Sequence, residues 1–319
     1  MNVLRSAARK LHLGSGLLKL RHHVYLGVKG SIELRNARRS ILPAIARAPA
    51  ASASDNVAEI HMLLGHVRVF EALWALLSLD RFSERSLSVI IHDDGSLTPD
   101  DGKLLRSKLP KLRIITKEEA DRVVKAEFER RQLHNCLRFR NRFIMARKLF
   151  DPALFATSAF YVALDSDVIF FDNAADLLGT IEGVDATRSR YSLDNGFRYS
   201  LPEEELKALI GRPIVQAANA GILRVRRGDI DLERIERHLN HSGFWNADGT
   251  PDYYAEMTIY ALELSVNGAT PLPESYGIAP ELPFSAEVVA GHYCGGIKSA
   301  HMYYARALPL LSEKLIDGR

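Results

Sequence analysis

The sequence predicts an α/β domain: a Rossmann-like, mixed and mostly parallel sheet flanked by helices. From residue 57 onward, short apolar runs alternate with segments of helical periodicity, which is the pattern of βαβ units. The chain has 319 residues, 47% of them hydrophobic and 25% charged, so it resembles an ordinary globular protein that buries a large core. Residues 1–50 differ from the rest in charge, which sets an N-terminal arm apart from the domain.

The predicted arm is strongly basic. Residues 1–50 contain ten Lys or Arg and a single acid, Glu33, for a net charge of +9, whereas the remainder carries −6. Segment 3–13 places its apolar residues on one helical face, which is typical of an interfacial helix, and 48–54 has the composition of a linker. We therefore expect residues 1–54 to be an arm and linker that can meet an anionic membrane surface, and 55–319 to be the domain. The alternative is a basic helix packed on the body.

The elements of the domain follow from its periodicity. Apolar runs bounded by turn residues predict strands at 57–64, 87–95, 112–116, 159–171 and 288–291. Apolar residues at helical spacing predict helices at 67–82, 97–110, most of 117–152, 202–210 and 254–264. Thr98 before Pro99 is the expected N-cap of the second of these helices, and Pro152 is the expected end of the third.

Composition also excludes several classes of protein. No stretch approaches the roughly 20 apolar residues of a membrane span. Two cysteines cannot form a disulfide scaffold, and no four-ligand zinc spacing appears. With no secretory leader pattern, we expect a cytoplasmic protein.

An acidic pair interrupts the most apolar segment of the chain. Asp165 and Asp167 follow the run 160–164, and the apolar run then resumes. Residues i and i+2 of an extended segment project to the same side, so two carboxylates share one face among apolar neighbours. Unpaired, they would be costly in desolvation and repulsion. A divalent cation such as Mg²⁺ or Mn²⁺ relieves both costs, and the carboxyl end of a strand is where α/β sheets bind ligands.

A second Asp-x-Asp pair has a different setting. With 19 Asp in the chain, chance alone predicts about one such pair, so the motif needs its context. Asp229 and Asp231 follow Gly228 where a helix begins, which predicts turn and cap chemistry.

Four segments in order resemble the GT-A-type nucleotide-sugar glycosyltransferases. FYVALDSDVIFF (160–171) resembles their D-x-D segment, and Asn219-Ala220-Gly221-Ile222-Leu223 resembles their N-[AS]-G-hydrophobic segment. His292-Tyr293-Cys294-Gly295-Gly296-Ile297-Lys298 resembles the H-[FY]-x-G-x-x-K segment of the retaining, glycogenin-like family, and 91–98 resembles the second-strand loop of bacterial relatives. The resemblance covers about residues 57–305. It departs from the family at Ser299-Ala300, where Pro-Trp is usual, and at Glu256-Met257, where an acidic-Gln pair is usual.

The resemblance implies a metal-dependent, hexosyltransferase-like enzyme of polysaccharide biosynthesis. It would move a sugar from a nucleoside-diphosphate donor, expected to be a UDP-sugar, to a glycan or lipid-linked acceptor. It implies Mn²⁺ or Mg²⁺ held by Asp165, Asp167 and His292. The implied donor-binding residues are Lys148 or Arg147, Asp165, Asn219, Gly221, Gly295, Gly296 and Lys298. The candidate catalytic carboxylates are Glu256, Asp252 and Asp194.

Two other functions stay open, and one partner is disfavoured. A sugar nucleotidyltransferase would carry a Gly-rich basic loop after its first strand, whereas 63–71 reads LLGHVRVFE. A non-catalytic nucleotide- or glycan-binding protein is the other alternative. Nucleic acid is not expected as a partner, because the body is net acidic and lacks an aromatic-rich basic platform. We expect a cytoplasmic enzyme held at the inner membrane face by its arm.

Overall fold

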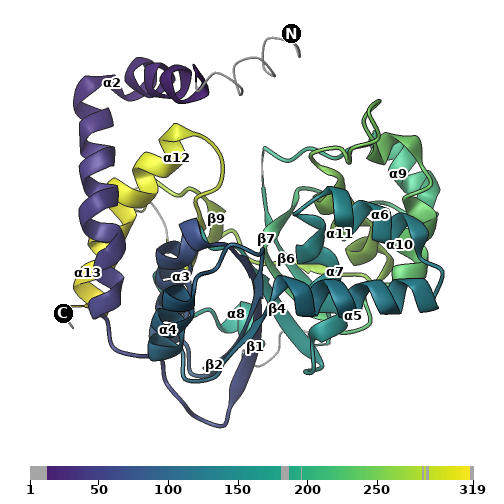
Figure 1. Cartoon of the computed structure of the whole chain (residues 1–319), viewed down its shortest axis with the longest axis horizontal. Coiled ribbons are helices and arrows are strands. Elements are labelled where there is room, and N and C mark those ends of the chain that lie inside the picture. The colour runs from purple at the N-terminus through teal and green to yellow at the C-terminus, as the bar shows by residue number, and fades with distance from the viewer. Residues whose placement is uncertain (1–12, 181–186, 195, 282–283, 285–286, 317–319) are drawn as a thin grey trace.

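Two sheets form the centre of this computed structural model, which describes residues 13–180, 187–194, 196–281, 284 and 287–316 (Figure 1). The larger sheet has seven strands in the order β3-β2-β1-β4-β7-β6-β8, and the smaller has three in the order β5-β10-β9. Their bounds are β1 Val57–Leu64, β2 Ser86–Asp93, β3 Leu112–Ile115, β4 Phe160–Leu164, β5 Val168–Phe170, β6 Arg190–Leu193, β7 Ala218–Arg226, β8 Thr270–Pro271, β9 Tyr276–Ile278 and β10 Ala290–His292.

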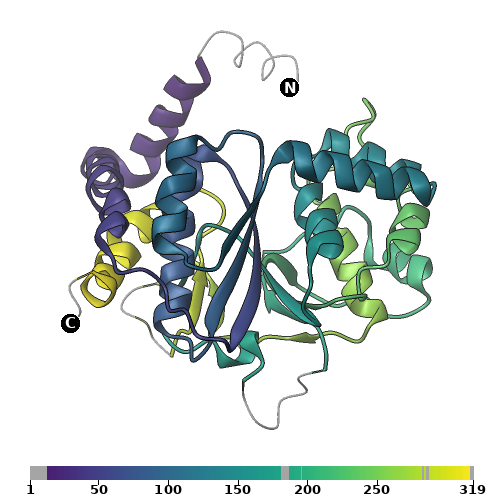
Figure 2. The ribbon, with the colours of Figure 1, turned by 60° about the horizontal axis from the view of Figure 1, so that its bottom comes forward.

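Helices cover the large sheet on both faces (Figure 2). The α-helices are α2 Leu13–Ile41, α3 Val69–Arg81, α4 Pro99–Lys108, α5 Lys117–Arg130, α6 His134–Arg142, α7 Ala146–Phe155, α8 Ala175–Leu178, α9 Glu203–Ile210, α10 Leu232–His238, α11 Ala255–Val266, α12 Ile297–His301 and α13 Leu308–Leu315. Shorter turns are η1 Leu42–Arg47, η2 His66–Arg68, η3 Ser242–Phe244 and the π-helical η4 Met302–Ala307.

The predicted mixed, mostly parallel α/β sheet is confirmed. Strands β3, β2, β1 and β4 run parallel, whereas β7 is antiparallel to both β4 and β6. Alternation along β1 separates two cores: Ile60 and Met62 pack with α3 on one face, and His61 faces the side of α5 to α7. This alternation is the period of two expected of an extended strand.

Most predicted elements lie where the periodicity placed them, with two differences. The run 159–171 does not form one strand, because the turn at Asp165–Asp167 sends β4 and β5 into different sheets. The long segment 117–152 divides into α5, α6 and α7, and its expected end at Pro152 is wrong, because α7 contains Pro152 and continues to Phe155. Thr98 caps α4 in a reciprocal capping box with Asp101, as expected.

The alternative expectation, a basic helix packed on the body, describes the part of the arm that the structure covers. The described part of the arm packs on the domain: Ile45 is fully buried, and Trp74 donates its indole N–H to the carbonyl of Leu42 at 3.1 Å. The stretch 48–54 is also fixed, with Ala51 buried and the Ser52 amide bonded to Asp80 at 3.0 Å. Small residues here allow close packing instead of flexibility, so in this structure no separate linker divides the described arm from the domain. The predicted interfacial helix at 3–13 lies almost entirely outside the described residues.

Helix α2 runs along the domain beside α12 and α13 (Figure 1). It bends at Gly27, whose φ of 67° is the left-handed conformation that glycine adopts most easily. Glu33, the one acid of residues 1–50, lies 3.3 Å from both His301 and Arg306. Among the described residues, no helix combines the length and the apolar character needed to cross a bilayer.

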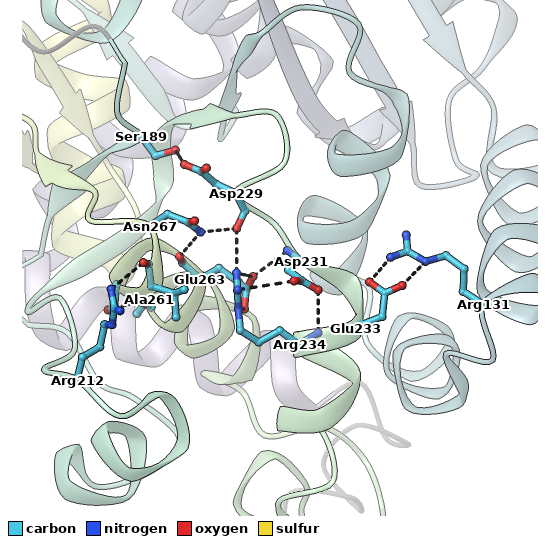
Figure 3. A network of polar contacts seen from close by, with 12 residues as sticks. Arg131, Ser189, Arg212, Asp229, Asp231, Glu233, Arg234, Ala261, Glu263 and Asn267 are labelled. Carbon is cyan, nitrogen blue, oxygen red and sulfur yellow. Dashed lines mark hydrogen bonds and ion pairs between the residues drawn. The ribbon is translucent and has the colours of Figure 1, made fainter.

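The second Asp-x-Asp pair does the turn and cap work expected of it (Figure 3). Asp231 caps α10 by accepting from the Arg234 amide, and Asp229 accepts from the Ser189 hydroxyl at 2.7 Å. Arg234 in turn binds the buried Glu263 of α11 through two hydrogen bonds of 2.8 and 2.6 Å. This network joins the turn after β7 to α10 and α11.

Candidate functional site

Asp165, Asp167 and His292 meet at the carboxyl end of β4. The two aspartates occupy the turn between β4 and β5, and His292 ends β10, which pairs with β5 so that His292 lies opposite Val168. Nε2 of His292 is 3.2 Å from Oδ1 of Asp167 and 3.7 Å from Oδ2 of Asp165. One ligand atom from each residue lies within 4.8 Å of the others. The small sheet thus brings a distant histidine to the acidic pair.

The three side chains fit a hard divalent cation. Nε2 of His292 is buried and has no hydrogen-bond partner among the described residues, although it points at two carboxylates. Burial alone would lower the pKa of His292, but contact with Asp167 outweighs it and raises the pKa to about 10. Burial opposes ionisation of Asp167, yet His292 and nearby cations lower the pKa of this carboxyl. The site therefore attracts positive charge, whether a proton or a metal ion, at the position where Nε2 of His292 and two carboxylates converge.

Lys148 and Glu256 extend the charged cluster. Nζ of Lys148, on α7, lies 2.6 Å from Oδ1 of Asp165 and 4.0 Å from Oε1 of Glu256, on α11. Burial disfavours the ammonium, but attraction to Asp165 and Glu256 raises the pKa of Lys148. Burial also raises the pKa of Glu256 to about 7, although Lys148 opposes this. The phenol of Tyr260 donates to the carbonyl of Lys148 at 2.6 Å, which ties α7 to α11.

Adjacent Arg147 and Lys148 have different surroundings. Arg147 lies 3.2 Å from Asp121 of α5, whereas Lys148 lies 2.6 Å from Asp165. Lys148 is therefore the member of the predicted pair that reaches Asp165.

Asn219 and Gly221 of β7 lie directly behind His292. The Asn219 side-chain oxygen accepts from the amide of Gly221 at 2.7 Å and lies 3.0 Å from Nδ1 of His292. The Asn219 amide nitrogen donates to Asp194, directly after β6, at 3.2 Å. The carbonyl of Gly221 accepts from the backbone amide of Asp165 at 2.9 Å. These contacts connect both predicted residues of β7, and Asp194, to the cluster.

Four predicted site residues are not joined to this cluster by the contacts of the described residues. Lys298 has a side chain that is 69% exposed and pairs with Glu281 at 2.9 Å. Gly295 and Gly296 form the open turn before it, and Gly295 has a φ of 97°. Asp252 accepts from the Ser200 hydroxyl at 2.6 Å and from the Tyr254 amide, so it braces the loop before α11. Their functional roles stay predictions.

Arg68 is a candidate that the sequence pattern did not single out. It ends η2, directly after β1, and its NH1 lies 3.4 Å from the buried Glu71. Its charge is close enough to Asp167 to help lower the pKa of that carboxyl. The sequence feature that could have indicated Arg68 is its position just beyond the carboxyl end of the first strand, where α/β sheets bind ligands.

No protein-family model and no curated protein matches this chain. Solved structures do match it, and glycosyltransferases are among them. Mouse xyloside xylosyltransferase 1, in its apo form, is 12% identical over 76% of this chain and 99% of its own, with a TM-score of 0.49. The galactosyltransferase LgtC, solved with donor and acceptor sugar analogues, is 17% identical over 81% of this chain and 96% of its own, with a TM-score of 0.49. GlyE of Streptococcus pneumoniae TIGR4 is 13% identical over 82% of this chain and 64% of its own, also at 0.49.

Proposed function

We propose that this protein is a metal-dependent glycosyltransferase that uses a nucleoside-diphosphate sugar, with a UDP-sugar as the expected donor. One observation carries the proposal: Asp165, Asp167 and the orphaned Nε2 of His292 converge at the carboxyl end of β4, with Lys148 beside them. This combination suits a diphosphate, because a cation and an ammonium both neutralise the charge that the leaving group gains.

Each residue has a proposed task. Asp165, Asp167 and His292 hold Mn²⁺ or Mg²⁺, which when bound supplies Lewis-acid neutralisation of the leaving diphosphate. Lys148 orients Asp165 and faces the donor side. The loop at Gly295 and Gly296, with Lys298 after it, is the proposed second contact with the diphosphate, since glycines allow close backbone approach and lysine offers a point charge.

The acceptor side is proposed to depend on carboxylates. Glu256 has the strongest case, because it lies beside Lys148 and its raised pKa of about 7 allows it to exchange a proton near neutral pH. Asp194 contacts the cluster through Asn219, and Asp252 lies on the loop before α11. We propose these three as the carboxylates that orient the reacting sugar and the acceptor hydroxyl.

The first experiment is a donor assay with and without metal. UDP-sugar hydrolysis or transfer, followed as release of UDP, is expected to need Mn²⁺ or Mg²⁺ and to be lost in Asp167→Asn. Asp172→Asn is the matched control, because Asp172 is an exposed aspartate just after β5. Activity that persists in excess EDTA would overturn the proposal. Release of pyrophosphate from a nucleoside triphosphate and sugar phosphate would instead indicate a nucleotidyltransferase.

We also propose that the acceptor is a glycan or a lipid-linked molecule. The enzyme would be cytoplasmic and bind an anionic inner membrane face. Helix α2 supports it with an outward stripe at helical spacing: Val28 is 65% exposed, Ile32 is 48% exposed, and Arg35 and Arg39 are exposed beyond them. Apolar side chains next to arginines suit a surface of anionic lipid, which attracts each nearby basic residue by about 1 kcal/mol.

Vesicle sedimentation tests this second part. Removing residues 1–54 would take away Ile45, which is fully buried, and expose the core residues that it covers. Variants that change only charge are therefore the better probe. Arg35→Gln with Arg39→Gln is expected to weaken binding to phosphatidylglycerol-rich vesicles by about 30-fold, at about 1 kcal/mol for each charge. Arg122→Gln with Lys125→Gln, an exposed basic pair on α5, is the control. Equal binding by the two double variants would contradict the role of α2.

A further inference from the structure

We propose that Asn219 is a positioning residue that fixes the ring of His292 so that Nε2 faces the cation. This inference rests on the proposed metal site and assigns Asn219 a task that acts through His292. It follows from three contacts of one amide side chain: with Gly221, with His292 and with Asp194.

The contacts define which end of the amide faces His292. The backbone N–H of Gly221 can only donate, so the atom that it meets at 2.7 Å is the Asn219 carbonyl oxygen. The other end lies 3.2 Å from a carboxylate oxygen of Asp194, which accepts from the amide nitrogen. Because the oxygen accepts, Nδ1 of His292 at 3.0 Å must carry a proton. A neutral imidazole with its proton on Nδ1 has its lone pair on Nε2, which is the atom aimed at Asp165 and Asp167.

The same strand blocks other placements of the ring. A β-carbon at position 221 would lie 2.1 Å from Cε1 and 2.5 Å from Nδ1 of His292, so the ring packs directly against the backbone of β7. The carbonyl of Gly221 also accepts from the amide of Asp165. One short segment, 219–221, therefore sets both the histidine and the first aspartate of the cluster.

Asp194 holds the far end of the amide. Its own carboxylate accepts from the amide of Gly196 at 2.8 Å, and its backbone amide donates to Ala217 at 2.8 Å. Asp194 is thus anchored to the β6–β7 pair before it accepts from Asn219. The result is a chain from Asp194 through Asn219 and His292 to the cation position, and such supporting contacts commonly change metal affinity by about 10- to 100-fold.

The test measures Mn²⁺ binding directly, from the electron paramagnetic resonance signal of the free ion. Asn219→Ala is expected to bind Mn²⁺ about 10- to 100-fold more weakly than wild type. Ser192→Ala is the matched control, because Ser192 is a buried residue that lies opposite Asn219 in the β6–β7 register. Urea unfolding of both variants without metal shows whether a loss of stability accounts for the loss of binding.

An exchange of the two side chains separates positioning from bulk. Asn219→Asp alone places two carboxylates against each other and is expected to weaken Mn²⁺ binding. Asn219→Asp combined with Asp194→Asn restores an acceptor for His292 and a donor between the two positions, so it is expected to recover affinity to within about threefold of wild type, a difference of about 0.6 kcal/mol. Failure of the exchange to recover affinity would count against the proposal.

A second measurement on the wild-type protein keeps the inference testable if the variants do not fold. With ¹¹³Cd²⁺ as a diamagnetic probe, nitrogen NMR is expected to show metal coupling to Nε2 of His292 and a proton on Nδ1. Coupling to Nδ1, or equal Mn²⁺ affinity in Asn219→Ala and wild type, overturns the positioning role alone. Absence of any metal binding by the wild-type protein would instead overturn the proposed metal site.

Discussion

Gly221 lies so close to His292 that a methyl group on its α-carbon would overlap all three of Cε1, Nδ1 and Nε2, at 2.1, 2.5 and 2.8 Å. His292 is held on its other sides by Asn219 and Asp167, so it has little room to yield. The glycine of the N-x-G segment is therefore required by packing against the histidine, and not by a left-handed backbone.

Gly221→Ala is accordingly expected to displace His292 and to weaken Mn²⁺ binding by about tenfold or more, the scale seen when the supports of a metal ligand are disturbed. Isothermal titration calorimetry measures this effect. Gly277→Ala is the control, because a β-carbon there would meet its nearest neighbour, the Glu274 carbonyl, at 3.7 Å, which is ordinary contact. Similar losses in the two variants would show that the effect is not specific to His292.

Lys148→Met should lower donor affinity without abolishing metal binding. The change removes the ammonium that lies 2.6 Å from Asp165, so a bound diphosphate loses an attractive positive charge. The metal ion no longer competes with this ammonium for the Asp165 carboxylate. We expect UDP binding to weaken by about 1.5–3 kcal/mol, the scale of a hydrogen bond to a charged group.

Arg147→Met, at the adjacent position, is the control and should leave UDP affinity nearly unchanged, because Arg147 faces Asp121. Calorimetry with UDP and Mn²⁺ distinguishes the two variants. Loss of Mn²⁺ binding in Lys148→Met would contradict the assignment of the cation to Asp165, Asp167 and His292.

The sequence predicts the central sheet and the acidic pair because both depend on local pattern. Alternation and apolar runs locate β1, β2 and β3 directly, and the position of Asp165 after β4 marks the sheet edge. Spacing could not choose between Arg147 and Lys148, since neighbouring helical residues differ only in the direction in which they point. Their partners come from other elements: Arg147 meets Asp121, and Lys148 meets Asp165 of the acidic pair.

Other features depend on contacts between distant segments. The sequence left open whether residues 1–50 form a separate arm or pack on the body, because basic charge alone does not distinguish the two. Ile45 and Leu42 enter a core that α3 provides. The departure of β5 into the small sheet was not predicted, because 159–171 is apolar throughout on both sides of the turn. Only the pairing of β5 with β10 reveals why His292 reaches the aspartates.

Acid should destabilise the fold through two buried histidines. His61 and His92 lie 2.8 Å apart between ring nitrogens, and Nε2 of His61 meets Glu59 at 2.8 Å. Burial lowers the pKa of His61, although Glu59 opposes this, and burial together with His61, Arg140 and Arg113 lowers the pKa of His92 well below its usual value. As pH falls, these histidines take up protons in the unfolded chain at a higher pH than in the folded protein. The free energy of unfolding therefore decreases as pH falls from about 7 to about 5.

Urea unfolding at several pH values tests this expectation. His92→Gln should lose less stability than wild type over that range, by about 1 kcal/mol or more, since one unit of pKa shift is worth about 1.4 kcal/mol. His134→Gln, at an exposed histidine of α6, should follow the wild-type curve. Groups with raised pKa values, such as Glu256, are common to all three proteins and cancel in the comparison. Parallel curves for wild type and His92→Gln would refute the role of the pair.

The buried pair Arg140–Asp151 should dominate the stability of the α5–α7 layer. Arg140 donates to both carboxylate oxygens of Asp151 at 2.7 and 2.9 Å, and it also reaches Asp121 at 2.7 Å. Asp151→Ala leaves the buried guanidinium of Arg140 with Asp121 as its remaining carboxylate partner. We expect this to lower the free energy of unfolding by about 3–5 kcal/mol. Asp100→Ala removes a partner of Lys103 in a pair whose side chains are exposed, and should cost about 1 kcal/mol or less. Chemical unfolding measures both, and comparable losses would mean that burial does not set the strength of the Arg140 pair.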